Sequence, residues 1–172
     1  TVYKYISETG DMAFLDEVIP FADKEEGTVY EHLKRAVDFS MNHLGVHGMP
    51  AGLYADWNDC LRLGKAGESS FVAMQFYYAM TILKKFAEYK GDTDYIAYLE
   101  EKQKQQGDVI NEFCWNEDRF IRGFTEAGET IGKRTDNEAN MWLNPQSWSV
   151  ISGLATEEQT EKAMENVYEK LN

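Results

Sequence analysis

Helix-start and helix-stop signals recur along the chain, and they constrain its fold more than any other feature of the sequence. Thr28-Val29-Tyr30-Glu31 and Thr156-Glu157-Glu158-Gln159 both match the capping box, in which Ser or Thr precedes Glu or Gln by three positions. Lys90-Gly91-Asp92 indicates a helix-ending glycine followed by an N-capping aspartate. Asn144-Pro145 indicates an N-cap with proline in the first helical position.

Apolar residues recur at helical spacing between these signals and predict a mainly helical chain. The predicted helices span residues 28–42, 69–89, 93–113 and 144–152, and a last one starts at Thr156 and buries Ala163, Met164, Val167, Tyr168 and Leu171. A surface β-hairpin is predicted from Arg119–Phe124 and Glu129–Gly132. No Pro- or Ser-rich linker interrupts the pattern, so we expect one all-α domain with one small β-hairpin.

Two connections between predicted helices have similar sequences. Residues 5–15 and 86–96 both contain a helix, a Gly-Asp pair and a second helix. The similarity is compatible with repeated helical hairpins and equally with ordinary capping chemistry. The chain also begins at Thr1 in the middle of a helical pattern, so we expect it to be part of a longer protein.

The charge of the chain excludes several classes of partner. Asp and Glu number 30 against 17 Lys and Arg, and the net charge of −13 leaves no basic patch for nucleic acid or an anionic membrane. No apolar run approaches the roughly 20 residues of a membrane helix. Cys60 and Cys114 lack the spacing of a metal site and are expected to be free thiols of a cytoplasmic protein. His43 and His47 lack a third ligand, so no metal is expected.

The chemistry is expected in residues 47–68, which form a long, Gly-rich connection between two predicted helices. Within it, Asp56 and Asp59 flank Trp57 and Asn58. An indole can stack on a sugar ring, and it can raise the pKa of a neighbouring carboxyl, as a general acid requires. A carboxylic acid beside an aromatic platform is typical of glycoside cleavage. A purely structural explanation is also open, in which Asp56 caps an Asx turn and Trp57 belongs to the core.

Residues 52–61, followed by Gly67-Glu68-Ser69, resemble the active-site segment of glycoside hydrolase family 94, the phosphorylases of cellobiose and N,N'-diacetylchitobiose. Residues 26–36 and 144–153 resemble two further stretches of that family, so the resemblance spans nearly the whole chain. Cellobiose-specific members often carry arginine at the position of Tyr54. This difference favours a relative that acts on N-acetylglucosaminyl or other β-linked units.

The resemblance implies a fold and a reaction. Residues 1–172 would be a central fragment of a catalytic (α/α)6 barrel. The enzyme would cleave a β-linked disaccharide with inorganic phosphate and invert the anomeric centre, giving an α-sugar 1-phosphate and a free sugar. Asp59 would be the general acid and Trp57 would contact the sugar in the donor subsite. Asp56 and Asn58 would order the loop. The choice of Asp59 over Asp56 rests on the resemblance alone.

Phosphate is itself an anionic nucleophile, so the reaction would need no organic cofactor and no second carboxylate as base. The resemblance implies that the groups holding phosphate lie outside residues 1–172. Arg119, Arg122 and Arg134 lie on or near the predicted hairpin and are expected to face solvent. The resemblance also implies that the full-length enzyme is a cytoplasmic homodimer. Two rivals stand beside this hypothesis: an inverting hydrolase on the same barrel, and a non-catalytic helical-repeat module that binds other proteins.

Overall fold

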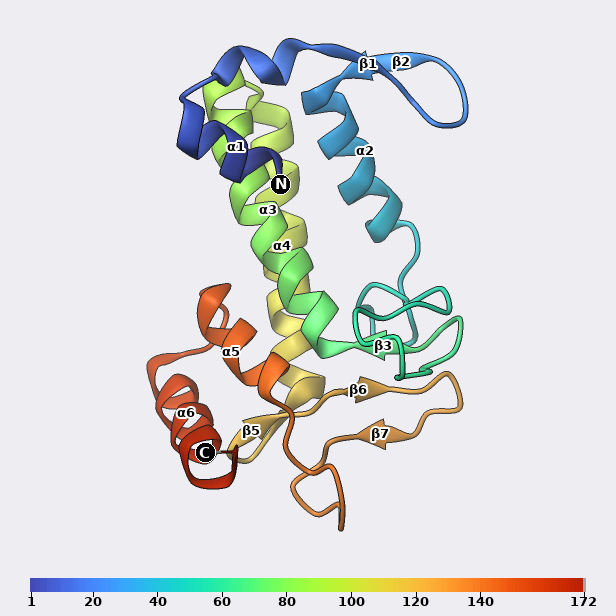
Figure 1. Ribbon diagram of the computed structural model, residues 1–172, viewed down its shortest axis with the longest axis vertical. Helices are drawn as coiled ribbons and strands as arrows, with labels where there is room; N and C mark the ends of the chain where they lie inside the picture. Colours follow the sequence, from blue (N-terminus) through green and yellow to red (C-terminus); the bar gives the residue numbers. More distant parts are fainter. Residues whose placement is uncertain (172) are drawn as a thin grey trace.

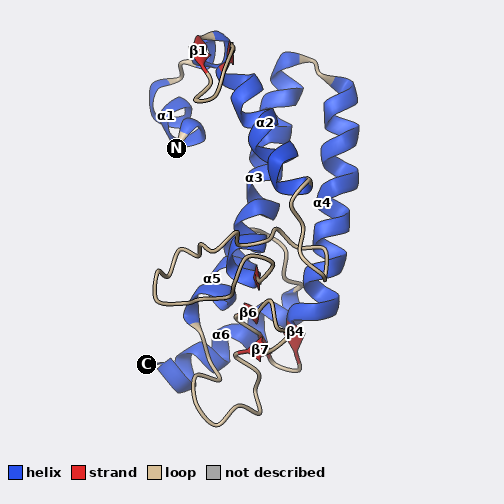
Figure 2. Cartoon of the chain, turned by 90° about the vertical axis from the view of Figure 1, so that its right-hand side faces the viewer, coloured by secondary structure: helices blue, strands red, loops and turns tan. Residues whose placement is uncertain are grey.

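A helical hairpin forms the long axis of the molecule in the computed structural model, which describes residues 1–171. Helices α3 (Ser70–Lys90) and α4 (Thr93–Cys114) run antiparallel and side by side (Figures 1 and 2). The other helical elements are α1 (Val2–Thr9), the 3-10 helix η1 (Met12–Asp16), α2 (Val29–Met41), α5 (Leu143–Ile151) and α6 (Glu157–Leu171). None of the helices within residues 1–171 is both long and apolar enough to cross a membrane.

The predicted caps of α2, α4 and α6 are confirmed. Thr28 Oγ1 accepts the Glu31 N–H at 3.1 Å, and Glu31 Oε2 accepts the Thr28 N–H at 2.6 Å, so the capping box is complete. Thr156 and Gln159 exchange the same pair of bonds at the start of α6. Asp92 Oδ1 accepts the Tyr95 N–H at 3.2 Å and so caps α4.

Helix α5 starts earlier than predicted, so the assignment of Asn144 as its N-cap is wrong. The N-cap is Trp142, whose backbone is extended, and Pro145 is the third helical residue. A proline is tolerated there because the first four N–H groups of a helix have no acceptor within the helix.

Two apolar clusters divide the core along the hairpin. The first lies where α1, η1 and α2 pack on one end of α3 and α4, and it includes Leu15, Val37, Met80 and Leu99. The second lies at the other end, where loops, short strands and α5 meet, and it includes Met49, Met74, Ile110, Phe120 and Phe124. Met49 of the second cluster belongs to the segment 47–68, in which the chemistry is predicted.

Seven short strands form three small antiparallel sheets within residues 1–171, so the prediction of one hairpin is wrong. The strands are β1 (Val18–Pro20), β2 (Glu26–Thr28), β3 (Glu68–Ser69), β4 (Trp115–Asn116), β5 (Arg119–Phe120), β6 (Gly123–Phe124) and β7 (Thr130–Ile131). The predicted pairing of β6 with β7 is present, but β6 also pairs with β3, and β5 turns back onto β4. Strands of two or three residues are too short to produce an alternating pattern in the sequence.

The predicted buried face of α6 is only partly covered. Ala163 is buried, whereas Tyr168 is 72% exposed and Leu171 is 46% exposed. The helix packs on α5 and β5, and Met164 and Val167 are half-buried. The prediction of burial is therefore confirmed for Ala163 and wrong for Tyr168 and Leu171.

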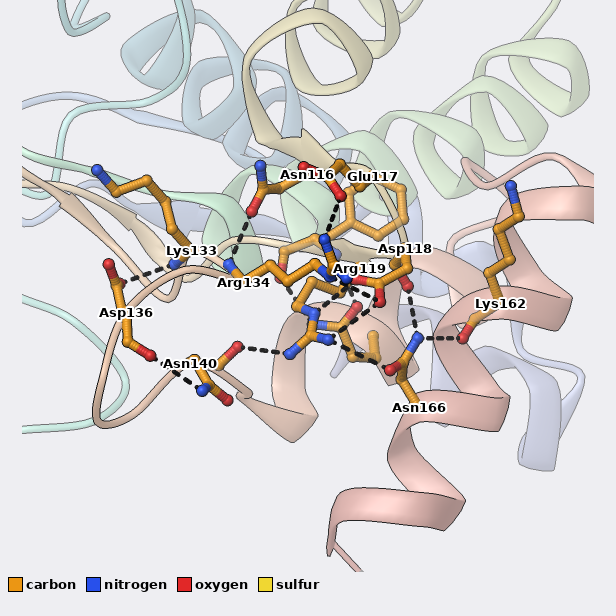
Figure 3. Close-up of polar contacts among 12 residues, drawn as sticks. Asn116, Glu117, Asp118, Arg119, Lys133, Arg134, Asp136, Asn140, Lys162 and Asn166 are labelled. Carbon is orange, nitrogen blue, oxygen red and sulfur yellow. Dashed lines mark hydrogen bonds and ion pairs between the residues drawn. The ribbon is translucent and has the colours of Figure 1, made fainter.

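Arg119 is fully buried, so the prediction that it faces solvent is wrong. Figure 3 shows its polar contacts. Its guanidinium donates to Asp118 Oδ1 at 2.7 Å, to the Asn140 carbonyl at 3.0 Å and to Asn166 Oδ1 at 3.2 Å. These partners come from the β4–β5 turn, the loop before α5 and helix α6. Arg119 therefore ties three segments together. Arg134 is half-exposed, as predicted, and pairs with Glu117.

Replacing Asp118 with asparagine should destabilise the full-length protein by about 2 kcal/mol at neutral pH, because a charged hydrogen bond to a buried guanidinium is lost. The hydrogen bond from Arg119 holds the pKa of the Asp118 carboxyl below its usual range. The carboxylate thus contributes stability above its unfolded pKa of about 3.9, and this contribution disappears as pH falls through the lower folded value. Urea unfolding from pH 7 to pH 2 should show the two proteins converging at acid pH.

Asp108→Asn is the matched control. Asp108 pairs with Lys104 on the surface of α4, where both side chains are more than 60% exposed. The cost of this change should be about 0.5 kcal/mol or less. A loss in Asp118→Asn that is no larger than in the control, or that does not change with pH, would contradict the role of the buried pair.

Candidate functional site

Residues 52–67 form a loop that closes on itself between α2 and β3. The Gly52 N–H donates to the Gly67 carbonyl at 2.8 Å, and the Leu53 N–H donates to the Lys65 carbonyl at 3.0 Å. The two ends of the loop are thus joined at its base. The segment predicted as a long connection between helices is a closed, hydrogen-bonded loop that contains Asp56, Trp57 and Asp59.

A tight turn at the start of the loop places Tyr54 on the surface. Leu53 and Tyr54 have φ values of 51° and 70°, and the Ala55 N–H donates to the Gly52 carbonyl at 2.8 Å. Positive φ is costly for residues other than glycine and persists where the surroundings hold it. A Cβ at Gly52 would lie 2.8 Å from the Ala55 carbonyl oxygen, so this turn needs glycine there.

Two overlapping turns hold the central part of the loop. Asp56 Oδ1 accepts the Asn58 N–H at 2.9 Å, and Asn58 Oδ1 accepts the Cys60 N–H at 3.2 Å. Both are Asx-type bonds, in which a side chain replaces a backbone acceptor. The Leu61 N–H also donates to the Asn58 carbonyl at 2.8 Å. Asp59 lies inside this second turn, so its backbone position follows from Asp56 and Asn58.

The Asp59 side chain is exposed at a hollow of about 730 Å³ between the loop and the β6–β7 hairpin. No described residue donates a hydrogen bond to its carboxylate. The hollow is within the size range of small-molecule sites. Its lining residues are Tyr54, Ala55, Asp56, Asp59, Leu61, Arg62, Leu63, Gly64, Thr125, Glu126, Ala127 and Glu129.

Trp57 does not line this hollow. Its side chain is 72% exposed, and its ring lies at 89° to the Phe71 ring with a centroid distance of 6.0 Å. The explanation of Trp57 as a core residue is therefore wrong. The structure does not bring its indole and the Asp59 carboxyl to the same hollow, although both belong to one loop.

Arg122 and Asp56 form a buried ion pair, so the prediction that Arg122 faces solvent is wrong. The two side chains are 2% and 0% exposed, and Arg122 Nη2 donates to Asp56 Oδ1. Arg122 Nη1 donates to Ser69 Oγ at 2.6 Å. The only signal in the sequence is a single arginine within the otherwise apolar run 120–124.

Glu68, to which the sequence assigned no role of its own, is a second buried carboxylate, and it anchors the segment before the loop. It is 1% exposed and accepts His47 Nδ1 at 2.5 Å and the Met49 N–H at 3.0 Å. The His47 ring stacks on Phe124 at 3.9 Å. A Cβ at Gly45 would lie 2.4 Å from the Glu68 side chain, so glycine lets the backbone approach this carboxylate.

The hairpin also holds the far side of the loop. The Glu126 N–H donates to the Leu63 carbonyl at 2.7 Å, and Glu126 Oε2 accepts the Lys65 N–H at 2.8 Å. Arg62 is the one cationic residue among those that line the hollow. Within residues 1–171, no three His, Cys, Asp or Glu side chains are grouped so that they could hold a metal ion. The thiol of Cys60 is exposed and that of Cys114 is buried.

Comparisons with known proteins give a consistent result along the whole chain. The sequence profile of the glycosyl hydrolase 94 superfamily, catalytic domain, matches residues 1–172. The N,N'-diacetylchitobiose phosphorylase of Vibrio furnissii is 37% identical over 177 residues, which cover 99% of this chain and 22% of that protein. The solabiose phosphorylase of Paenibacillus borealis is 35% identical over 176 residues, covering 100% of this chain and 23% of that protein.

Solved structures share the fold at much lower sequence identity. A GH78 family rhamnosidase of Bacillus sp. GL1 superposes with a TM-score of 0.73 at 14% identity, over 98% of this chain and 16% of that one. The chain therefore spans about a fifth of the length of the phosphorylases that it matches.

Proposed function

This chain belongs to the glycosyl hydrolase 94 superfamily and is part of its catalytic domain, and on that premise we propose that it carries the general acid of a disaccharide phosphorylase. The full-length enzyme would cleave a β-linked disaccharide with inorganic phosphate and invert the anomeric centre. The observation that carries the proposal is the match to disaccharide phosphorylases over the entire chain, which includes the loop of Asp59.

Asp59 is the proposed acid. In the reaction, a phosphate oxygen forms a bond to the anomeric carbon while the bond from that carbon to the glycosidic oxygen breaks. The Asp59 proton goes to the departing oxygen and yields the free sugar, and Asp59 then regains a proton from solvent. The exposed position of its side chain at a hollow of about 730 Å³ supports this role, because substrate could reach it.

Trp57, Asp56 and Asn58 are given supporting roles. The exposed indole of Trp57 offers a flat apolar face that a sugar ring could stack on in the donor subsite. Asp56 and Asn58 accept backbone N–H groups of the loop, and these bonds support their proposed role in ordering it. The substrate would be a disaccharide of the cellobiose or N,N'-diacetylchitobiose type, and the phosphorylase of Vibrio furnissii favours the latter.

The rest of the site would come from chain outside these residues. Phosphate needs cationic and hydrogen-bonding groups, and Arg62 alone among the residues lining the hollow is cationic. We also assign the antiparallel α3–α4 pair and the neighbouring α5–α6 pair to an (α/α)6 barrel. Inorganic phosphate would serve as co-substrate, with no organic cofactor.

The test is turnover of a panel of β-linked disaccharides by the full-length enzyme with and without phosphate. We expect sugar 1-phosphate in the α configuration, formed only when phosphate is present. Free sugar released at an equal rate without phosphate would contradict the proposal and would indicate an inverting hydrolase, which needs a second carboxylate. A helical-repeat module would neither bind nor cleave any of the sugars, and tryptophan fluorescence would not respond to them.

A further inference from the structure

We propose that Arg122 is a positioning residue for the general acid, and this inference rests on the proposed role of Asp59. Arg122 directly precedes strand β6, which is far from the loop in sequence, and its guanidinium lies between that loop and the start of α3. It would set where the Asp59 carboxyl lies at the hollow without touching substrate itself.

Rigid neighbours fix the guanidinium on three sides. Nη1 donates to Ser69 Oγ at 2.6 Å, and Ser69 is the N-cap of α3. The centre of the guanidinium lies 5.7 Å from the Phe71 ring and 5.6 Å from the Trp142 ring. Since the side chain is 2% exposed, it has no alternative hydrogen-bond partner in solvent. These contacts fix the direction in which the second nitrogen, Nη2, donates its hydrogen bond.

The Asp56 carboxylate accepts the hydrogen bond from Nη2 and in turn holds the backbone of the loop. Asp56 Oδ1 accepts both Arg122 Nη2 and the Asn58 N–H. Asn58 then accepts the Cys60 and Leu61 N–H groups, which enclose Asp59. Asp59 is thus two turns away from a buried ion pair. A displacement of about 1 Å of a reacting group can lower a rate by roughly 100-fold. Loss of this restraint on the position of Asp59 is therefore expected to lower the rate of cleavage.

Arg119 provides an internal comparison for a role in stability alone. It lies three residues earlier, is also fully buried, and also pairs with a carboxylate, that of Asp118. Its partners belong to the turn before it, the loop before α5 and helix α6, and none belongs to the loop of Asp59 (Figure 3). A lysine at either position keeps the charge but cannot form the same set of bonds as the planar guanidinium.

The experiment measures leaving-group dependence in the full-length enzyme with Arg122→Lys, Arg119→Lys and Asp59→Asn. Each variant is assayed for phosphorolysis of a β-linked disaccharide, whose departing oxygen needs a proton, and of the matching β-glycosyl fluoride, whose fluoride leaves without one. A positioning role predicts that Arg122→Lys raises the fluoride-to-disaccharide rate ratio roughly 10- to 100-fold. Arg119→Lys should lower the unfolding midpoint and leave the ratio within about twofold.

The outcomes separate the two proposals. If Asp59→Asn raises the ratio and Arg122→Lys does not, the positioning role is wrong and the acid assignment stands. If Asp59→Asn leaves the ratio unchanged, the acid assignment fails and the positioning role falls with it. An equal rise in Arg119→Lys would also overturn it, because general loosening would explain both. If Arg122→Lys does not fold, the neutral pair Arg122→Met with Asp56→Asn replaces it with the same expected rise.

Discussion

Replacing Asp59 with asparagine in the full-length enzyme is expected to lower kcat/KM for an unactivated β-linked disaccharide by roughly 10²- to 10⁴-fold. Asparagine has nearly the same shape but no proton to give to the departing glycosidic oxygen. Phosphorolysis of the matching β-glycosyl fluoride should be far less affected. Because the Asp59 side chain is exposed and no described residue bonds to its carboxylate, the change should leave the unfolding free energy close to that of the parent.

Glu129→Gln is the matched control, since Glu129 is exposed and lines the same hollow. This variant should retain activity within about threefold, as expected for a surface carboxylate with no proton-transfer role. Full activity of Asp59→Asn on the disaccharide would refute the acid assignment. A loss of activity in Glu129→Gln as large as in Asp59→Asn would indicate a second essential carboxylate and therefore hydrolysis by an inverting mechanism.

Replacing Gly123 with alanine is expected to destabilise the full-length protein by at least about 2 kcal/mol. The φ of Gly123 is 155°, and a Cβ there would lie 2.3 Å from the Glu68 carbonyl oxygen. Backbone cannot give way as a flexible side chain can, so β3 and β6 would separate. Their separation would move Arg122 and Ser69 apart, and activity on the disaccharide should fall together with the midpoint of urea unfolding.

Gly128→Ala separates the clash from the φ effect. Gly128 also has a positive φ, 85°, but nothing lies within 4 Å of a Cβ built there. It should therefore cost only about 1 kcal/mol, the price of the left-handed conformation, and leave activity unchanged. Equal losses in the two variants would show that the close approach of β6 to Glu68 contributes nothing.

The helices could be predicted because their signals are local. The Thr28–Glu31 and Thr156–Gln159 boxes bond within four residues, and Gly91 takes the left-handed conformation with a φ of 67°. The hairpin of β6 with β7 could be predicted for the same reason, because its two strands are neighbours in the chain. The pairing of β6 with β3 could not, since the two strands are two residues long and more than 50 positions apart in the chain.

In the candidate site, too, only the residues that are neighbours in the chain could be predicted. Asp56, Trp57, Asn58 and Asp59 are consecutive, and their residue types alone suggested sugar chemistry. Arg122 and Glu68 carry no such signal, because their importance comes from burial beside partners from distant segments. Arginine near a turn faces solvent in most proteins, and the prediction for Arg119 and Arg122 followed that tendency. Both arginines are buried instead, because each guanidinium is surrounded by three or more hydrogen-bond acceptors or aromatic rings.

The sequence by itself determined the caps of α2, α4 and α6, the existence of the helices α3 and α4, the family, and the loop that carries the candidate acid, because each of these is marked by short stretches of residues. Only the tertiary structure decided that the loop closes on itself, that Trp57 is exposed, and that two arginines are buried. A charge leaves water only when partners from several elements meet around it. Which partners surround a buried charge depends on how the elements pack, and this cannot be predicted from any short stretch of the sequence.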